Sequence, residues 1–214
     1  MAEDTKMQAE AWDPRGKRTA VLMIDIQRNF WSDNEGIREK FPHFPASVSK
    51  LLELCRKEGS EVPLVIHIKA EYSEEKGSAW IPYFYDVVHE NSAMKNTSQN
   101  QEFEDFSRPV NSDRGPREIA IEKPCFDGFL QTNLEEELAA AGIQQVYACG
   151  LITSACVQHT VHGAFARGYC PVLFEDCCGD RSVEIHDAAL GLYGGYMYTV
   201  ATTKQLEQSL AREM

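Results

Sequence analysis

Six short apolar segments recur along the chain, and their pattern predicts the strands of a buried sheet. They are rich in β-branched and aromatic residues, and most run unbroken rather than alternating with polar residues. Unbroken apolar runs of this length are typical of parallel strands that are covered on both faces. The predicted strands are Thr19–Asp25, Val62–Ile68, Glu118–Glu122, Gln145–Gly150, Pro171–Glu175 and Tyr196–Val200.

Segments with helical spacing of apolar residues lie between these strands. The first helix is predicted around Val48, Leu51, Leu52 and Cys55, with Gly59 as its C-cap. The second follows a capping box of Thr132 and Glu135 and ends at Gly142. Three more are predicted from about Cys156 to Gly168, from Ser182 to Tyr193, and around Leu206 and Leu210. Strands alternating with helices indicate βαβ crossovers. We therefore predict an α/β fold, a doubly wound, six-stranded, mainly parallel sheet with helices on both faces, as in a Rossmann-like three-layer sandwich.

The length of 214 residues fits one domain, which we place at residues 18–214 after a flexible polar lead-in at 1–17. One connection, from Lys69 to Arg117, is too long for a simple turn, and its 79–85 stretch is strongly aromatic. Long loops in compact domains are often lids or binding loops, so we expect a lid or substrate loop here. An aromatic patch packed against a helix or another subunit is an equal alternative.

Charge and cysteine content exclude several classes of protein. The formal net charge is −12 and there is no basic stripe, so nucleic-acid binding is not expected. No apolar run reaches membrane-spanning length, and the first residues lack the apolar core of a secretory signal. Seven irregularly spaced cysteines, without a C-x-x-C pair, favour reduced thiols, mostly in the core, in a cytoplasmic protein. The adjacent Cys177 and Cys178 are expected to pack rather than to form a strained disulfide.

Three reactive side chains follow three predicted strands: Asp25, Lys123 and Cys156. The carboxyl ends of parallel strands share one edge of the sheet, where doubly wound folds bind ligands. The start of a helix is expected to lower the pKa of the Cys156 thiol and to offer N–H groups to an oxyanion. Taken singly, the aspartate is more often a turn residue, the lysine a solvated charge and the cysteine a packing residue. Their coincidence favours a catalytic site.

The chain resembles the isochorismatase-like cysteine hydrolases, which include nicotinamidases, N-carbamoylsarcosine amidohydrolase and biuret hydrolase. The resemblance rests on the segments 22–30 (LMIDIQRNF), 123–129 (KPCFDGF), 150–157 (GLITSACV) and 175–179 (EDCCG). It implies that Asp25, Lys123 and Cys156 are base, lysine and nucleophile. It also implies a cis peptide bond between Leu151 and Ile152, and an oxyanion hole made by the N–H groups of Ile152 and Cys156.

The resemblance further implies a hydrolase that cleaves the C–N bond of a small amide or ureido compound through a thioester. Phe30 matches a pocket wall and Gln27 falls near the site, while the positions of Lys69, Tyr72, Trp80 and Tyr83 suggest further substrate contacts. The family often forms dimers or tetramers. An idle member that serves as an interaction module, or a vinyl-ether hydrolase of the isochorismatase type, remains an alternative.

Family nicotinamidases bind a divalent metal through an Asp-x-His and a second histidine, and this chain has no such spacing around His67. We therefore expect no metal, no other cofactor and a substrate other than nicotinamide. His67 is expected to be a paired core residue. His159 follows the cysteine by one helical turn, and a Cys–His dyad is a weaker alternative to Asp25.

Overall fold

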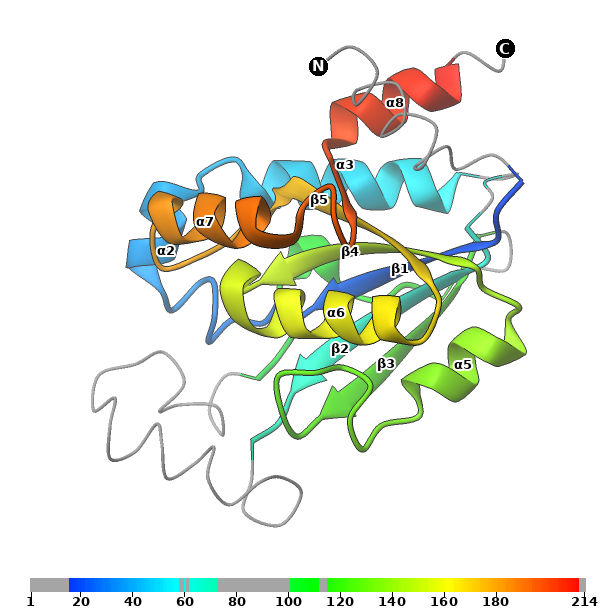
Figure 1. Cartoon of the computed structure of the whole chain (residues 1–214). Helices are drawn as coiled ribbons and strands as arrows, with labels where there is room; N and C mark the ends of the chain where they lie inside the picture. Colours follow the sequence, from blue (N-terminus) through cyan, green and yellow to red (C-terminus); the bar gives the residue numbers. More distant parts are fainter. Residues whose placement is uncertain (1–15, 58–59, 61, 73–100, 112–114, 212–214) are drawn as a thin grey trace.

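The computed structural model describes residues 16–57, 60, 62–72, 101–111 and 115–211. Its centre is a six-stranded sheet in the order β3-β2-β1-β4-β5-β6, in which every pairing is parallel (Figure 1). The strands are β1 (Thr19–Ile24), β2 (Leu64–Ala70), β3 (Arg117–Lys123), β4 (Gln145–Leu151), β5 (Cys170–Gly179) and β6 (Thr199–Ala201). The predicted doubly wound α/β fold is thus confirmed.

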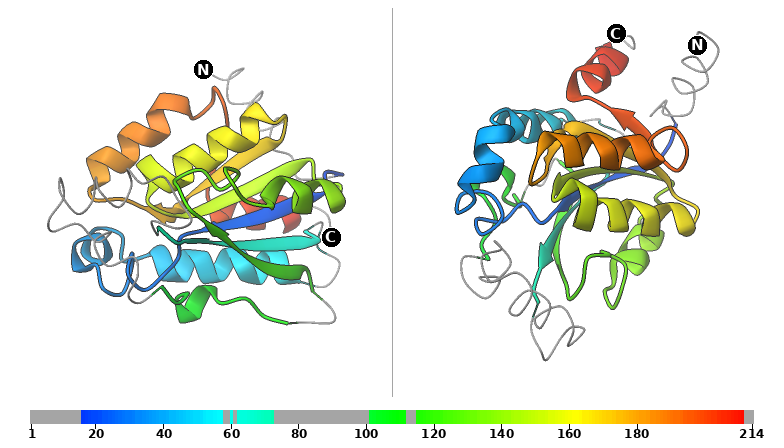
Figure 2. Two further views of the ribbon diagram at one scale, coloured as in Figure 1. Left: turned by 90° about the horizontal axis from the view of Figure 1, so that it is seen from below. Right: turned by 60° about the vertical axis from the view of Figure 1, so that its left-hand side comes forward.

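Helices cover both faces of the sheet, as the unbroken apolar strands require (Figure 2). One face carries α5 (Leu134–Ala140), α6 (Gln158–Ala166) and α7 (Val183–Tyr193), and the other carries α3 (Phe44–Arg56) and α8 (Thr203–Ala211). Two short turns, η3 (Asp105–Ser107) and the π-helical η4 (Thr153–Val157), and the helix α2 (Glu35–Lys40) complete the described elements. No helix among the described residues is long and apolar enough to cross a bilayer.

Several boundaries differ from the sequence-based prediction. β2 runs to Ala70 and β5 to Gly179, whereas the predicted Tyr196 start of the last strand is a turn in which Tyr196 is 82% exposed. The helix α2 was not predicted, because its single buried residue gives no apolar period. Gly59 and residues 1–15 lie outside the described part of the chain.

The long connection between β2 and β3 returns beside the end of β1. Phe103 bridges Gln27 in antiparallel fashion, and the N–H of Glu104 donates to the carbonyl of Ile26 at 3.1 Å. The Glu104 carboxylate then accepts from the N–H of Ser32 at 3.0 Å. This part of the connection therefore braces the loop after β1. The connection from Lys69 to Arg117 was expected to form a lid or substrate loop, and its residues 73–100, with Trp80 and Tyr83, lie outside the described part of the chain.

All seven cysteines are free thiols. Five are buried, and Cys177 and Cys178 have no exposed surface, in agreement with the packing role predicted for them. Cys125 and Cys170 differ from the prediction of core thiols, because both are partly exposed.

Candidate active site

The order of the sheet brings two of the three candidate residues to its switch point. β1 and β4 are neighbours, and the chain leaves them toward opposite faces, to α3 and to α6. Asp25 follows β1 and Cys156 lies in η4 directly after β4. In doubly wound folds, ligands bind where the winding reverses. Lys123 ends β3, two strands from β1, so its long side chain has to cross the end of β2.

The backbone at this switch point is tightly constrained. Asp25 has a φ of 52°, a left-handed conformation that aspartate tolerates better than most residues, and its N–H donates to the carbonyl of Ile68 at 2.9 Å. Gly150 has a φ of 130°, and a Cβ there would lie 1.9 Å from the carbonyl oxygen of Ile24. Only glycine lets β4 approach β1 this closely, one residue before Asp25.

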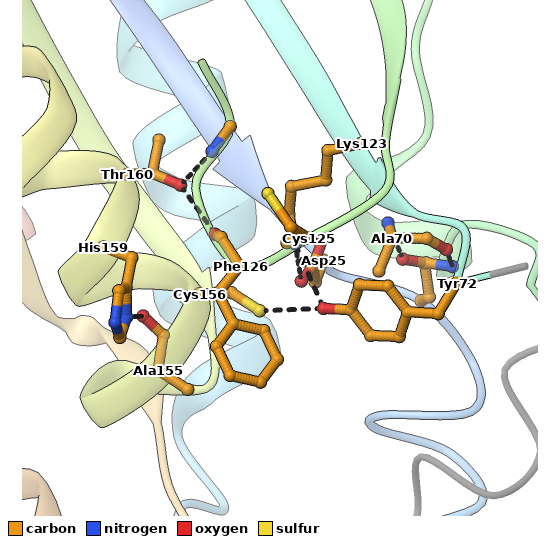
Figure 3. A network of polar contacts seen from close by, with 12 residues as sticks. Asp25, Ala70, Tyr72, Lys123, Cys125, Phe126, Ala155, Cys156, His159 and Thr160 are labelled. Atoms are coloured by element: carbon orange, nitrogen blue, oxygen red, sulfur yellow. Dashed lines mark hydrogen bonds and ion pairs between the residues drawn. The ribbon is translucent and has the colours of Figure 1, made fainter. Parts of the chain in front are cut away.

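Lys123 has no exposed side-chain surface, yet its ammonium has three partners (Figure 3). Its Nζ lies 2.8 Å from Asp25 Oδ2, donates to the carbonyl of Cys125 at 2.9 Å, and donates to the hydroxyl of Tyr72 at 3.3 Å. A lysine ammonium has three donors. Each is thus used, which is what makes a buried cation tolerable.

Cys156 is 3% exposed, and its sulfur lies 3.2 Å from the Tyr72 hydroxyl (Figure 3). Lys123 pairs with Asp25, and the Tyr72 hydroxyl lies 3.3 Å from Lys123 Nζ as well as 3.2 Å from the Cys156 sulfur, so the three predicted residues belong to one cluster. The peptide bond between Leu151 and Ile152 is cis, as the family resemblance implied.

The turn that carries the thiol is held by its neighbours. The N–H of Ser154 donates to the buried carboxylate of Asp180 at 2.7 Å. The hydroxyl of Thr153 donates to the carbonyl of Gly179 at 3.0 Å and lies 2.8 Å from Nδ1 of the buried His186. These supports come from the end of β5 and from α7. Only the EDCCG segment before Asp180 hinted at them in the sequence.

The protonation states differ from the expectation for a helix-start thiol. Burial, followed by the charge of Asp25, raises the pKa of Cys156 to about 12, and Lys123 and Tyr72 only partly oppose this. The predicted lowering of the thiol pKa toward neutrality is therefore wrong for the resting site. The start of a helix stabilises a thiolate by much less free energy than burial costs it, and Cys156 is only 3% exposed.

The two charged neighbours are shifted as well. Burial raises the pKa of Asp25, which Lys123, Cys156 and the backbone of Ala70 offset only in part. Burial works against the ammonium of Lys123, but the charges of Asp25 and Cys156 outweigh it, so the pKa of Lys123 is raised. The carboxyl of Asp25 and the ammonium of Lys123 thus face each other at 2.8 Å, beside a thiol whose pKa burial raises to about 12. A carboxylate with a raised pKa is also a stronger base than an ordinary one.

The KPCFDGF segment after β3 is clamped to the helix that follows the cysteine. Thr160 on α6 accepts from the N–H of Gly128 at 2.9 Å and donates to the carbonyl of Phe126 at 3.3 Å. A Cβ at Gly128 would meet the Thr160 side chain at 2.9 Å, so glycine is needed for this contact. The clamp fixes the loop that supplies Lys123 relative to the turn that supplies Cys156.

The residues predicted to contact substrate lie in different surroundings. Tyr72 lies beside Lys123 and Cys156 in the cluster. Gln27 is buried and acts on the backbone, because its side chain accepts from the N–H of Ala70 at 2.8 Å and donates to its carbonyl at 3.3 Å. Phe30 is buried in the core, and its place as a pocket wall stays a prediction.

Lys69 is not brought to the cluster. Its ammonium lies 3.4 Å from Glu122, its register partner on β3, and it lines a separate hollow with Phe103 and Glu136. β2 continues to Ala70, so the pleat directs the Lys69 side chain to another face.

The histidines occupy other positions. His67 is fully buried and its Nε2 lies 2.8 Å from Glu118, which confirms the predicted paired core residue. Nδ1 of His159 lies 2.7 Å from the carbonyl of Ala155, and the ring packs on Phe126. Among the described residues, no three His, Cys, Asp or Glu side chains are grouped as metal ligands.

Comparison of the sequence with known proteins finds a matching family and several relatives. A sequence model of the isochorismatase domain matches residues 19–205. The chain is 27% identical over 207 residues to a nicotinamidase of Arabidopsis thaliana, covering 96% of this chain and 95% of that protein. It is 26% identical to a ureidoacrylate amidohydrolase of Acinetobacter baylyi, covering 86% of this chain and 80% of that protein.

Solved structures show the same fold. A cysteine hydrolase from Pseudomonas syringae pv. phaseolicola has a TM-score of 0.75 at 17% identity, covering 92% of this chain and 94% of that chain. The N-carbamoylsarcosine amidase from Thermoplasma acidophilum has a TM-score of 0.66 at 22% identity, covering 87% of this chain and 96% of that chain. Because the span matched by the domain model contains Asp25, Lys123 and Cys156, and covers most of the chain, the protein belongs to the isochorismatase family.

Proposed function

We propose that this protein is a cysteine-dependent hydrolase that cleaves the C–N bond of a small amide or ureido compound through a thioester. The observation that carries the proposal is the cluster itself: a buried thiol, a carboxylate and an ammonium from three strand ends, with Asp25 and Lys123 in a 2.8 Å ion pair. Relatives named for amide and ureido substrates support the same class of reaction.

The reaction begins with the thiol proton. The Asp25 carboxylate takes this proton as the Cys156 sulfur attacks the carbonyl carbon, so the sulfur is charged only while the new C–S bond forms. This order suits a thiol whose resting pKa is raised to about 12. Lys123 stays protonated and stabilises the negative charge that passes between carboxylate and sulfur.

The tetrahedral intermediate then collapses. Its C–N bond breaks, and ammonia or the amine leaves with the proton that Asp25 holds. Water, deprotonated by Asp25, attacks the thioester carbon, the acid is released, and the sulfur recovers its proton. Asp25 thus acts as base and then as acid during acylation, and as base and then as acid again during hydrolysis.

Backbone N–H groups of Ile152 and Cys156 are proposed to bind the oxyanion. Around them, the N–H of Ser154 is taken by Asp180, and those of Ala155 and Val157 by the carbonyl of Ile152. These bonds hold the turn in shape before substrate arrives. Preorganised donors of this kind typically contribute about 2.7–4 kcal/mol to transition-state stabilisation.

The proposal is tested with a panel of small amides and ureido compounds assayed for ammonia release. Cys156→Ala should abolish turnover. Cys125→Ala is the matched control, since this second thiol lies in the segment after β3, donates to the carbonyl of Asp127 at 3.4 Å, and its residue binds the Lys123 ammonium through the backbone carbonyl, which alanine keeps. It should retain activity within a few-fold. A wild-type protein that hydrolyses none of the panel contradicts the proposal and favours a non-catalytic role. Cys156→Ala at full rate contradicts the role of the thiol as nucleophile.

We also propose a homo-oligomer in the cytoplasm. Leu192 at the end of α7 is 66% exposed and Tyr196 in the next turn is 82% exposed, an apolar surface that suits a subunit contact. The seven free thiols suit a reducing compartment. Light scattering of the purified protein gives the number of subunits, and a mass of 24.1 kDa would contradict the oligomer.

A further inference from the structure

Tyr72 was expected only as a substrate contact, but its hydroxyl lies among the candidate catalytic groups. Oη is 3.2 Å from Cys156 Sγ and 3.3 Å from Lys123 Nζ, and the residue is 8% exposed. It follows β2 by two residues, so it enters the site from the strand that Lys123 has to cross. No part of the thioester scheme above uses this hydroxyl.

The direction of the two hydrogen bonds follows from chemistry. A lysine ammonium can only donate, so Lys123 donates and the Tyr72 oxygen accepts. The hydroxyl still has its own hydrogen to donate, and the Cys156 sulfur lies 3.2 Å from it, at hydrogen-bond distance. The chain of donors therefore runs from the ammonium through the hydroxyl to the sulfur. Hydrogen bonds in such a chain polarise one another, and a charged first donor strengthens the second.

The tyrosine ring is fixed in this position. It packs edge-to-face on Phe126, with 6.1 Å between the ring centroids, and Lys123 Nζ lies 5.4 Å from its centroid. Phe126 is in turn held through its backbone by Thr160 and packs on His159 of α6. The hydroxyl is thus aimed at the sulfur by the same loop and helix that carry the other site residues (Figure 3).

We propose that Tyr72 is a further catalytic residue, whose hydroxyl donates a hydrogen bond to the Cys156 sulfur as the thiol loses its proton. The proton moves from sulfur to the Asp25 carboxylate, and the sulfur electron pair forms the bond to the carbonyl carbon. Tyr72 keeps its own proton throughout and stabilises the charge on sulfur. This inference rests on the proposed cysteine chemistry.

The test compares Tyr72→Phe with Tyr72→Leu. Phenylalanine keeps the ring packing on Phe126 and Lys123 and removes only the hydroxyl, so the fold is retained. We expect kcat to fall about ten- to a hundredfold with KM unchanged, the range for losing one charge-assisted hydrogen bond. If stacking is the only role of the residue, Tyr72→Phe has wild-type kcat and Tyr72→Leu does not, and the inference is overturned.

A second measurement needs no substrate. The rate at which iodoacetamide alkylates Cys156 at fixed pH is followed by peptide mass spectrometry, with Cys125 as the reference in each digest. Each unit by which Tyr72→Phe raises the thiol pKa lowers this rate about three- to fourfold, since fewer thiolates form but each is more nucleophilic. An unchanged rate overturns the inference.

Tyr198→Phe is the control, because it removes a buried tyrosine hydroxyl that bonds Gln158 at 2.9 Å and does not contact the thiol. It should leave the alkylation rate of Cys156 unchanged, and an equal slowing in both variants overturns the specific role of Tyr72. Full activity of Cys156→Ala would instead overturn the hydrolase proposal, so the two failures are distinct.

Discussion

Replacing Lys123 by methionine tests the buried ion pair, because methionine has similar volume and no charge. Lys123 and Asp25 are at most 1% exposed and 2.8 Å apart. Removing the cation leaves a carboxylate in the interior, and losing one partner of a buried pair typically costs about 3–5 kcal/mol. We expect a destabilisation of this size at pH 7.

The cost should depend on pH in a defined direction. With Lys123 gone, the pKa of Asp25 rises further above its unfolded value, because burial already raises it and the opposing charge is lost. A carboxyl with a raised folded pKa binds more protons in the native state, so stability falls as pH rises from the unfolded pKa toward the folded one. Between pH 5 and pH 7 this amounts to as much as about 2.7 kcal/mol.

Urea unfolding of wild type and Lys123→Met at pH 5 and pH 7 measures this difference. Adding Asp25→Asn should remove the pH dependence and recover most of the stability, since asparagine is neutral and tolerates the left-handed φ of 52°. If Lys123→Met is destabilised equally at both pH values, or if the double variant is no more stable than the single one, the buried pair is not as described.

Three other predictions concern a buried ion pair of the core and two supports of the site. The pKa of Glu118 is lowered to about 2 by His67 and Arg56 despite burial. Glu118 should therefore add about 3 kcal/mol to the free energy of unfolding above pH 4.5, and this stability is lost as pH falls toward 2. Acid unfolding of Glu118→Gln should lack this step. Gly150→Ala should lower the free energy of unfolding in urea by roughly 3–5 kcal/mol and abolish ammonia release. Gly168→Ala is the control, because Gly168 also has a positive φ but has space for a Cβ, and it should cost about 1–2 kcal/mol. Thr160→Val should lower stability by about 1–3 kcal/mol and reduce kcat, and an unchanged kcat would show that the loop clamp does not position the site.

The sequence predicted those parts of the fold that depend on local patterns. β1, β4 and α7 agree closely with the prediction, because unbroken apolar runs and the Ser182 cap are local signals. The meeting of Asp25, Lys123 and Cys156 could be predicted as well, since parallel strands present their carboxyl ends at one edge.

What depends on tertiary packing was not predictable. The raised pKa of Cys156 results from burial beneath segments far apart in the sequence, whereas the helix-start argument used only local geometry. Likewise, whether Lys69 or Tyr72 reached the thiol depended on β2 ending at Ala70 rather than at Ile68. A shift of two residues in a strand end changes which side chains leave the sheet toward the site.

The proposed thioester mechanism requires a covalent acyl intermediate on Cys156. Acid quenching during turnover of an active panel amide, followed by peptide mass spectrometry, measures this directly. We expect an acyl adduct on the peptide containing Cys156, labile to hydroxylamine and absent from Cys156→Ala. An adduct on another cysteine, or steady turnover by Cys156→Ala, would contradict it.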